Sequence, residues 1–302
     1  MRRSLALTLS AGLLLALAGC SASPAAADCS TAATSGGSSD LVTASGDFGS
    51  DPAASFPSPL VPKQLERTVI TQGDGAEVGP GSTLDVTYSL YDGETGQSAG
   101  APTTGYIVLS DSLQGDLTDA LTCTHVGDRV AVALPNELAT QIASGAPGSL
   151  VMVFDIENAF PQAADGAPQP GQSGFPSVVH DENGRPGVGI NGPAPDEAKS
   201  ALIKKGDGDQ IKDGDQVLVQ STGVSYDTRK VTNSTWETGS PQLWVMSEDA
   251  STTQGSSQPA GITPFLVGQT VGSEVLVVLP GSGGGASATA YVVDILGILP
   301  AS

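Results

Sequence analysis

The sequence predicts an α+β protein that contains two copies of one domain. Two stretches carry this prediction: LTDALTCTHVGDRVAVALP, which begins at Leu117, and ITPFLVGQTVGSEVLVVLP, which begins at Ile262. They align without a gap, and each reads as a turn on glycine followed by a strand that a proline ends. A Gly-Asp-Gly phrase precedes each stretch, at Gly73 and again at Gly206, and an apolar run closes each copy. The spacing between these phrases differs between the copies only in the segments that join them, as expected for the loops of a duplicated domain.

Each copy contains the same succession of predicted elements. The segments TLDVTYSLY and QVLVQSTGV alternate apolar and polar residues, which is typical of strands. LTDALT and ITPFLV place apolar residues four apart, the spacing of one short helix packed on a sheet. SLVMVFDIENAF and TAYVVDILGIL are nearly continuous apolar runs, which favours central strands buried on both faces. We therefore expect several antiparallel strands and one short, late helix in each copy, with domains at residues 60–160 and 174–302.

Residues 1–19 predict export. A short basic segment, Met1-Arg2-Arg3, is followed by an apolar run that is shorter than the roughly 20 residues of a membrane span. Cys20 then follows two small residues, and this ending is similar to the lipobox of bacterial lipoproteins. The resemblance implies cleavage before Cys20, acylation of its thiol, and a lipid anchor on the extracytoplasmic face of the cell membrane. The alternative is an ordinary secreted protein in which Cys20 is incidental.

Two further segments are predicted to be flexible. Residues 20–59 are rich in Ser, Ala, Gly and Thr and offer few core side chains, so we expect a tether there. Within it, LVTASGDFGSDPAASFP carries spaced apolar residues that suit a short docked edge strand. Residues 161–173, PQAADGAPQPGQS, have the composition of an extended, flexible linker between the two copies.

The charge balance excludes two classes of ligand. The sequence has 32 acidic and 12 basic residues, which gives a formal net charge of −20. Such a chain repels nucleic acid and anionic lipid head groups, so contact with the membrane is expected through the lipid anchor only.

The cysteines agree with export. Once Cys20 is acylated, Cys29 and Cys123 remain, and an even pair in an oxidising compartment predicts a disulfide that joins the tether to the first copy. Two unpaired thiols are the alternative. No Cys or His cluster has metal-ligand spacing, and His125 and His180 stand alone, so we expect neither a metal nor another cofactor.

The order of these phrases resembles the FKBP family of peptidyl-prolyl cis-trans isomerases. The most specific matches are FLVGQTVGSEVLVVLP in the second copy and VMVFDIEN in the first, and the resemblance covers most of the chain after Val69. It implies two FKBP-like domains, each a curved antiparallel sheet with one short helix. It also implies an apolar, ring-lined proline pocket. Such a pocket would desolvate the planar peptide bond, whose barrier to rotation is ~18–20 kcal/mol, and favour the less polar twisted form.

In the first copy, the resemblance assigns four residues to this pocket: Tyr88, Tyr106, Leu117 and Phe154. Ordinary core packing is the alternative for Tyr88 and Phe154. The sequence departs from the family at Ser98-Ala99, where a Phe-Asp pair is usual, and after Pro135, where a Tyr is common.

The second copy keeps fewer of the pocket residues. Ser221 replaces the strand Tyr, Ile262 takes the floor position, and Val293 replaces the late Phe. Leu243 and Trp244 are left to line a remnant, so we expect this second pocket to be vestigial.

Two functions of different classes follow from the sequence. The first is an extracytoplasmic, lipid-anchored prolyl isomerase that acts on proline-containing exported polypeptides through its first domain. The second is a non-catalytic chaperone or protein-binding scaffold, favoured by the missing Phe-Asp pairs. A third, weaker hypothesis is an envelope lipoprotein that only spaces other components. An open cavity around Tyr88 and Phe154 would favour the enzyme, and collapsed side chains there would favour the scaffold.

Overall fold

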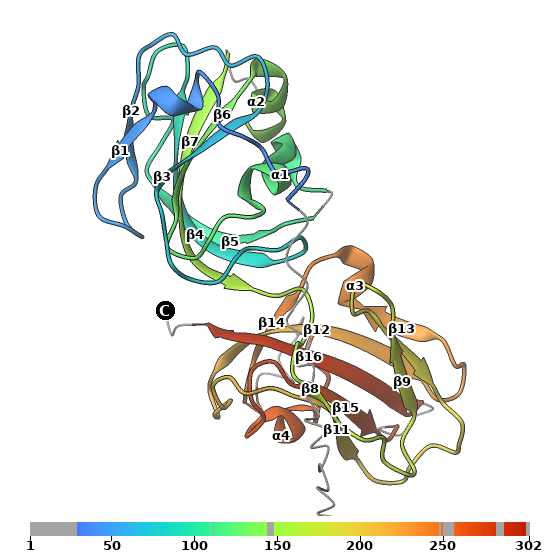
Figure 1. Ribbon diagram of the computed structural model, residues 1–302. Coiled ribbons are helices and arrows are strands. Elements are labelled where there is room, and N and C mark those ends of the chain that lie inside the picture. Colours follow the sequence, from blue (N-terminus) through green and yellow to red (C-terminus); the bar gives the residue numbers. More distant parts are fainter. Residues whose placement is uncertain are drawn as a thin grey trace, which may run out of the picture.

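The described part of the chain forms two large antiparallel sheets, one in each half, and two separate two-stranded hairpins in the computed structural model (Figure 1). The structure describes residues 29–110, 112–143, 148–247, 249, 257–281 and 287–299. The first sheet has the strand order β3-β6-β7-β4-β5, and the second has β13-β12-β16-β15-β11-β8, with β14 also paired to β12. The prediction of antiparallel sheets with few helices is confirmed.

The predicted signal peptide, residues 1–19, and the predicted lipidation site, Cys20, lie outside the described residues. Among the residues that are described, no helix is both long enough and apolar enough to span a bilayer.

The first domain is the half that contains the predicted pocket. Its strands are β3 (Glu66–Thr71), β4 (Thr83–Asp92), β5 (Thr103–Val108), β6 (Arg129–Leu134) and β7 (Leu150–Phe160). Its helices are α1 (Leu117–Leu121) and α2 (Asn136–Ile142), with 3-10 turns η1 (Ser39–Leu41) and η2 (Gln114–Asp116). A hairpin of β1 (Thr43–Ser45) and β2 (Ala53–Ser55) precedes the sheet.

The second domain repeats this plan. Its sheet contains β8 (Ala167–Pro168), β11 (Lys199–Lys205), β12 (Gln216–Ser225), β13 (Val231–Ser234), β14 (Gln242–Val245), β15 (Glu274–Leu279) and β16 (Thr289–Leu299). Its helices are α3 (Thr235–Thr238) and α4 (Thr263–Leu266), and its hairpin consists of β9 (Ser177–His180) and β10 (Pro186–Gly189).

The repeated glycine phrases meet in space, which explains why both copies retain them. A β-carbon on Gly73 would collide with the carbonyl oxygen of Val126, and a β-carbon on Gly206 would collide with that of Val271. The glycine that follows each valine has a positive φ, a backbone conformation that favours glycine. The same close approach of two turns therefore fixes glycine at equivalent positions in both copies.

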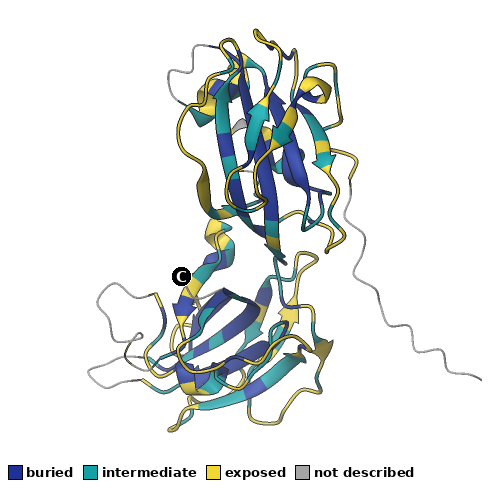
Figure 2. Cartoon of the chain, turned by 90° about the vertical axis from the view of Figure 1, so that its left-hand side faces the viewer, coloured by how far each residue is buried: buried dark blue, intermediate teal, exposed yellow. Residues whose placement is uncertain are grey.

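Each sheet has a helix face and a hairpin face. In the first domain, α1 and α2 pack on the helix face, and β1–β2 covers the hairpin face at Ala131, Val151 and Val153. In the second domain, α4 packs on one face and β9–β10 covers the other. The central strands β7 and β16 are buried on both faces, as their apolar runs predict (Figure 2).

In the second part of the predicted tether the spaced apolar residues dock, as predicted, but as a hairpin on a face of the sheet and not as an edge strand. Residues 39–55 form η1 and the β1–β2 hairpin, and Val42 and Leu60 are buried against the sheet. The carboxylate of Glu66 accepts the backbone N–H groups of Ser38 and Ser39, at 2.7 and 3.0 Å. Low hydrophobicity is misleading here, because a few small apolar side chains are enough to cover a sheet face that other strands have already built.

The predicted flexible linker also needs correction. Within residues 161–173, β8 pairs with β11 at the edge of the second sheet. The N–H of Ala164 donates to Asp294 Oδ1 at 3.0 Å, and the Ala164 carbonyl accepts from Lys204 Nζ at 2.9 Å. Pro-rich composition does not separate a linker from an edge strand, because proline is tolerated at a sheet edge.

The two domains also share an apolar contact. Phe160, at the end of β7, packs in a buried cluster with Leu218, Leu296 and Leu299 of the second domain. Its ring lies over Gly297, where a β-carbon would collide with it. The last residue of β7 is therefore fixed on the second domain, directly before the chain continues into that domain.

The sequence predicts one short helix per copy, and the structure has one more in each. After Pro135 ends β6, the segment NELATQI forms α2 and buries Ala139. In the second domain, α3 separates β13 from β14, both of which pair with β12. The spacing of apolar residues that is common to both copies predicts α1 and α4, and it cannot predict α2 or α3, which have no counterpart in the described part of the other copy.

The predicted disulfide between Cys29 and Cys123 is confirmed, with the two Cα atoms 5.9 Å apart. Cys123 follows α1 and has a φ of +59°, and the second copy has Gly268, with a φ of +88°, at the equivalent turn. The bond ties the start of the described chain to this turn.

Candidate functional site

A cavity of about 610 Å³ opens on the helix face of the first sheet. Its walls come from β4, β5 and β7, from α1 and α2, and from the segment that precedes α1. The apolar lining consists of Tyr88, Leu90, Ile107, Val108, Leu113, Leu117, Ile142 and Met152. None of the described lining residues is acidic or basic, and the polar ones are Tyr106, Ser110, Ser112, Gln114 and Ser240. The cavity suits an uncharged, largely apolar segment.

Tyr88 and Phe154 are direct neighbours on adjacent strands. They are paired between β4 and β7, with ring centroids 5.4 Å apart and ring planes tilted by 34°. Tyr88 is half-buried and lines the cavity, whereas Phe154 is completely buried in the core behind it. Phe154 therefore supports the Tyr88 ring and does not itself form a wall.

Leu117 forms part of the cavity lining at the first residue of α1. It is buried, and the hydroxyl of the next residue, Thr118, donates to the carbonyl oxygen of Ser110 at 2.8 Å. This bond fastens α1 to the segment that leaves β5, and it thereby fixes the position of Leu117.

The structure places Tyr106 on the other face of the sheet from Tyr88. Tyr106 is paired with Asp85, and directly paired residues project from the same face. Asp85 and Tyr88 are an odd number of residues apart on β4, so their side chains face opposite sides. Burial raises the pKa of the Tyr106 phenol, and the carboxylates of Asp85 and Glu157 raise it further. Tyr106 contributes to the rim only, and the next residue, Ile107, takes the inward position.

Ser98 and Ala99, which stand where the FKBP resemblance leads one to expect a Phe-Asp pair, provide neither an aromatic ring nor a carboxylate. Ser98 forms a bridge with Tyr91 in the β4–β5 hairpin, and the N–H of Ala99 donates to the Leu90 carbonyl at 2.8 Å. Both residues are exposed, so this hairpin supplies no functional group to the cavity.

Several lining residues are absent from the four that the sequence predicts. Ile142 comes from α2, where Leu138 and Ile142 are four apart, a helical spacing that could have indicated it. Met152 lies two residues before Phe154 on β7 and therefore shares its face. Ser240 comes from the second domain, and no local pattern indicates a contact of that kind.

The equivalent face of the second domain is filled. Trp244 occupies the position in the second sheet that Ile107 occupies in the first. Trp244 is paired with Val217 of β12, and Ile107 is paired with Leu84, the equivalent residue of β4. Trp244 is 1% exposed and belongs to the core cluster that contains Ile262. Tyr291 covers a glycine of β12, whereas Leu243 points outward with 45% of its surface exposed. The predicted remnant is thus closed by core side chains.

Two groups with metal-binding residue types have other partners. Cys29 and Cys123 lie near Glu77, but both sulfur atoms belong to the disulfide. His180 Nε2 lies 2.8 Å from Glu274 Oε1 in the second domain.

No protein-family model and no curated protein matches this chain. Among solved structures, it is similar to the three FKBP domains of wheat FKBP73, with 15% identity and a TM-score of 0.34 over 78% of this chain and 94% of that chain. FkpA from Escherichia coli has 20% identity and a TM-score of 0.28, over 41% of this chain and 53% of its own. The N-terminal domain of FKBP42 from Arabidopsis thaliana has 15% identity and a TM-score of 0.30, over 45% of this chain and 100% of its own. FKBP73 and FKBP42 are named as FKBP proteins, and the TM-scores of all three likenesses are too low to indicate a function.

Proposed function

We propose that this protein is an extracytoplasmic, lipid-anchored peptidyl-prolyl cis-trans isomerase that acts on proline-containing exported polypeptides through its first domain. The observation that supports the proposal is the cavity of about 610 Å³, whose described lining residues carry no charge, with Tyr88 in its wall. A proline ring and its preceding peptide bond are uncharged and largely apolar, so they match this lining.

The chemistry needs no nucleophile and no metal. Amide resonance makes the planar peptide bond more charge-separated than the twisted one and sets a rotation barrier of ~18–20 kcal/mol. An apolar wall disfavours the polar, planar form more than the twisted form, because transfer of an unpaired amide out of water costs free energy. The cavity would therefore bind the twisted bond better than the planar one, which is the requirement for catalysis.

Anchoring and location rest on the sequence. The lipobox at Cys20 supports attachment through acyl chains, and the net charge of −20 supports contact with the membrane through those chains only and disfavours nucleic acid. In cells supplied with a labelled fatty acid, the wild type is expected to incorporate the label and a Cys20→Ser variant is not. Equal labelling of the two would contradict the anchor.

A non-catalytic chaperone or scaffold is the second candidate. The filled face around Trp244 and the absence of a ring or carboxylate at Ser98-Ala99 favour it. Both candidates need the first cavity to bind a proline segment, so they differ in turnover and not in binding.

The test is cis-trans exchange of the blocked tetrapeptide Ala-Leu-Pro-Phe, followed by NMR with the chain from Ser21 onward. Tyr88→Ala is expected to lower kcat/KM by about tenfold or more, equivalent to roughly 1.4 kcal/mol of transition-state stabilisation. Tyr91→Ala is the matched control, because Tyr91 is on the same strand but packs on the hairpin face against Phe56. Binding without exchange catalysis would favour the scaffold, and no binding by a folded wild type would overturn both candidates.

A further inference from the structure

One wall of the first-domain cavity comes from the second domain. Every described lining residue except one lies between Tyr88 and Met152; the exception is Ser240, in the short loop between α3 and β14. Two segments far apart in the sequence therefore meet at the opening of the cavity.

The loop that carries Ser240 is fixed within its own domain. Thr235, the first residue of α3, is buried, and its hydroxyl accepts the N–H of Ser221 at 2.8 Å. Gly239 ends α3 with a φ of +65°, and the N–H of Ser240 donates back to the Thr235 carbonyl at 3.3 Å. Pro241 follows and restricts the backbone further. The loop has little freedom to swing away from this position.

The second domain is in turn held against the first. Phe160 is buried in the cluster of leucines beyond β7, over Gly297. A few residues later, the N–H of Gly166 donates to the carbonyl of Gly272 at 2.9 Å, which fixes the start of the second domain. The apolar anchor at Phe160 therefore opposes free rotation of one domain relative to the other.

We infer, on the basis of the proposed function, that residues 239–241 of the second domain form a specificity wall for the first-domain cavity. A proline segment must then lie between Ser240 on one side and the η2–α1 region, which contributes Leu113 and Leu117, on the other. The wall leaves room for an extended chain, and it disfavours a proline that is held in a folded surface. The second domain, whose own equivalent face is filled, thus acts as a part of the first site.

The geometry is tested without any peptide. Ser240→Cys in the chain from Ser21 gives one thiol for a nitroxide label, because Cys29 and Cys123 are bonded to each other. The label is expected to broaden the methyl signals of Leu113 and Ile142, which line the cavity. A label on the exposed Ser173, which does not line it, should leave these signals sharp. Sharp signals with the label at residue 240 would overturn the inference.

The specificity role is tested with the tetrapeptide Ala-Leu-Pro-Phe. Ser240→Trp is expected to weaken its binding by about tenfold, whereas Ser173→Trp should bind it like the wild type. Equal binding by both variants would overturn the wall while leaving the proposed function intact. If the folded wild type binds no peptide although the label broadens the cavity methyl signals, the proposed function fails and the specificity role falls with it.

Discussion

The two domains differ most clearly at one pair of buried charged positions. In the first domain, Arg129 on β6 is paired across the sheet with Asp155 on β7. In the second domain, the same strand positions hold Glu274 and Asp294, which are also paired directly. One copy thus contains an ion pair where the other contains two acids, although the surrounding strands are alike.

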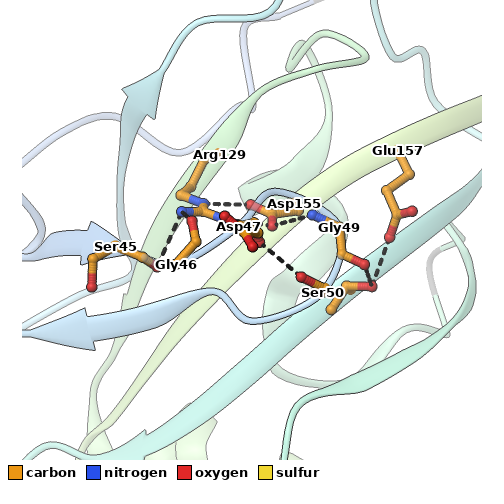
Figure 3. Close-up of polar contacts among 9 residues, drawn as sticks. Ser45, Gly46, Asp47, Gly49, Ser50, Arg129, Asp155 and Glu157 are labelled. Carbon is orange, nitrogen blue, oxygen red and sulfur yellow. Dashed lines mark hydrogen bonds and ion pairs between the residues drawn. The ribbon is translucent and has the colours of Figure 1, made fainter.

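In the first domain this pair holds the preceding hairpin (Figure 3). Arg129 donates to both carboxylate oxygens of Asp155, at 2.6 and 2.7 Å, and this hydrogen bonding raises the pKa of the arginine. The same guanidinium donates to the carbonyl oxygens of Ser45 and Gly46 at 3.1 and 2.9 Å. Asp155 accepts the N–H of Gly49 at 2.8 Å. The turn between β1 and β2 is therefore built around a satisfied ion pair.

In the second domain the equivalent pair holds its hairpin by different contacts. Glu274 lies 2.8 Å from Nε2 of His180 at the end of β9, and 2.9 Å from Nζ of Lys204. Asp294 Oδ1 accepts the Ala164 N–H, and burial followed by the charge of Glu274 raises the pKa of Asp294 to about 7. The equivalent pair of positions therefore fixes a hairpin in both domains, although one domain has arginine where the other has glutamate.

The largest expected effect comes from breaking the first pair. Arg129→Met leaves Asp155 buried without its partner, and we expect a loss of about 3–5 kcal/mol in the free energy of unfolding, measured with urea. Glu274→Gln is the matched change in the other domain, and it should cost far less because it removes one of two like charges. Equal losses from the two variants would show that the copies do not differ in this way.

A second comparison concerns the turn after the helix that the copies share. The first copy has Cys123 there, bonded to Cys29 at a sequence separation of 94, and the second has Gly268. Replacing both cysteines with serine is expected to lower stability by about 2–4 kcal/mol, because the unfolded chain gains freedom. A Cys29→Ser, Cys123→Gly variant should recover up to about 1 kcal/mol of this loss, because glycine accepts the positive φ. No difference between the two variants in urea unfolding would rule out strain at this turn.

Much of the fold can be predicted from the sequence because the determinants are local and occur twice. Glycine phrases, alternation and apolar runs depend on turns and sheet faces, and they correctly predict two sheets. The disulfide is predictable because only two cysteines remain after Cys20. Tyr88 and Leu117 line one cavity, since a strand residue and the start of the following helix share the helix face.

The remainder depends on contacts that no local pattern encodes. The face of Tyr106 depends on strand register, and a difference of one residue exchanges the two faces of a strand. The spaced apolar residues within residues 39–55 predict a docked strand but not a hairpin, which is held because Arg129, Glu66 and a preformed sheet face supply its partners. Ser240 reaches the cavity only because Phe160 fixes one domain on the other, a contact between residues that are distant in sequence.

The pH dependence of Asp294 tests the charge reversal most directly. Its pKa of about 7 in the folded protein lies above the ordinary value of 3.8, so the folded state binds the proton more tightly than the unfolded chain does. The resulting stability is fully present below pH 3.8 and is lost as the pH rises through 7. Asp294→Asn keeps an oxygen for the Ala164 N–H and removes the charge facing Glu274. We therefore expect this variant to exceed the wild type in the free energy of unfolding by urea at pH 8, by up to about 4 kcal/mol because each pKa unit corresponds to about 1.4 kcal/mol, and to match it near pH 4.

Asp155→Asn supplies the control, because the same substitution in the first domain removes the partner of Arg129 and should destabilise at pH 8. If the change in the free energy of unfolding has opposite signs for the two asparagine variants, the charged aspartate stabilises the first domain and the equivalent aspartate destabilises the second. If both variants destabilise, the Glu274 carboxylate is held well enough by Lys204 and His180 to leave Asp294 charged without penalty, and the charge reversal was fully compensated.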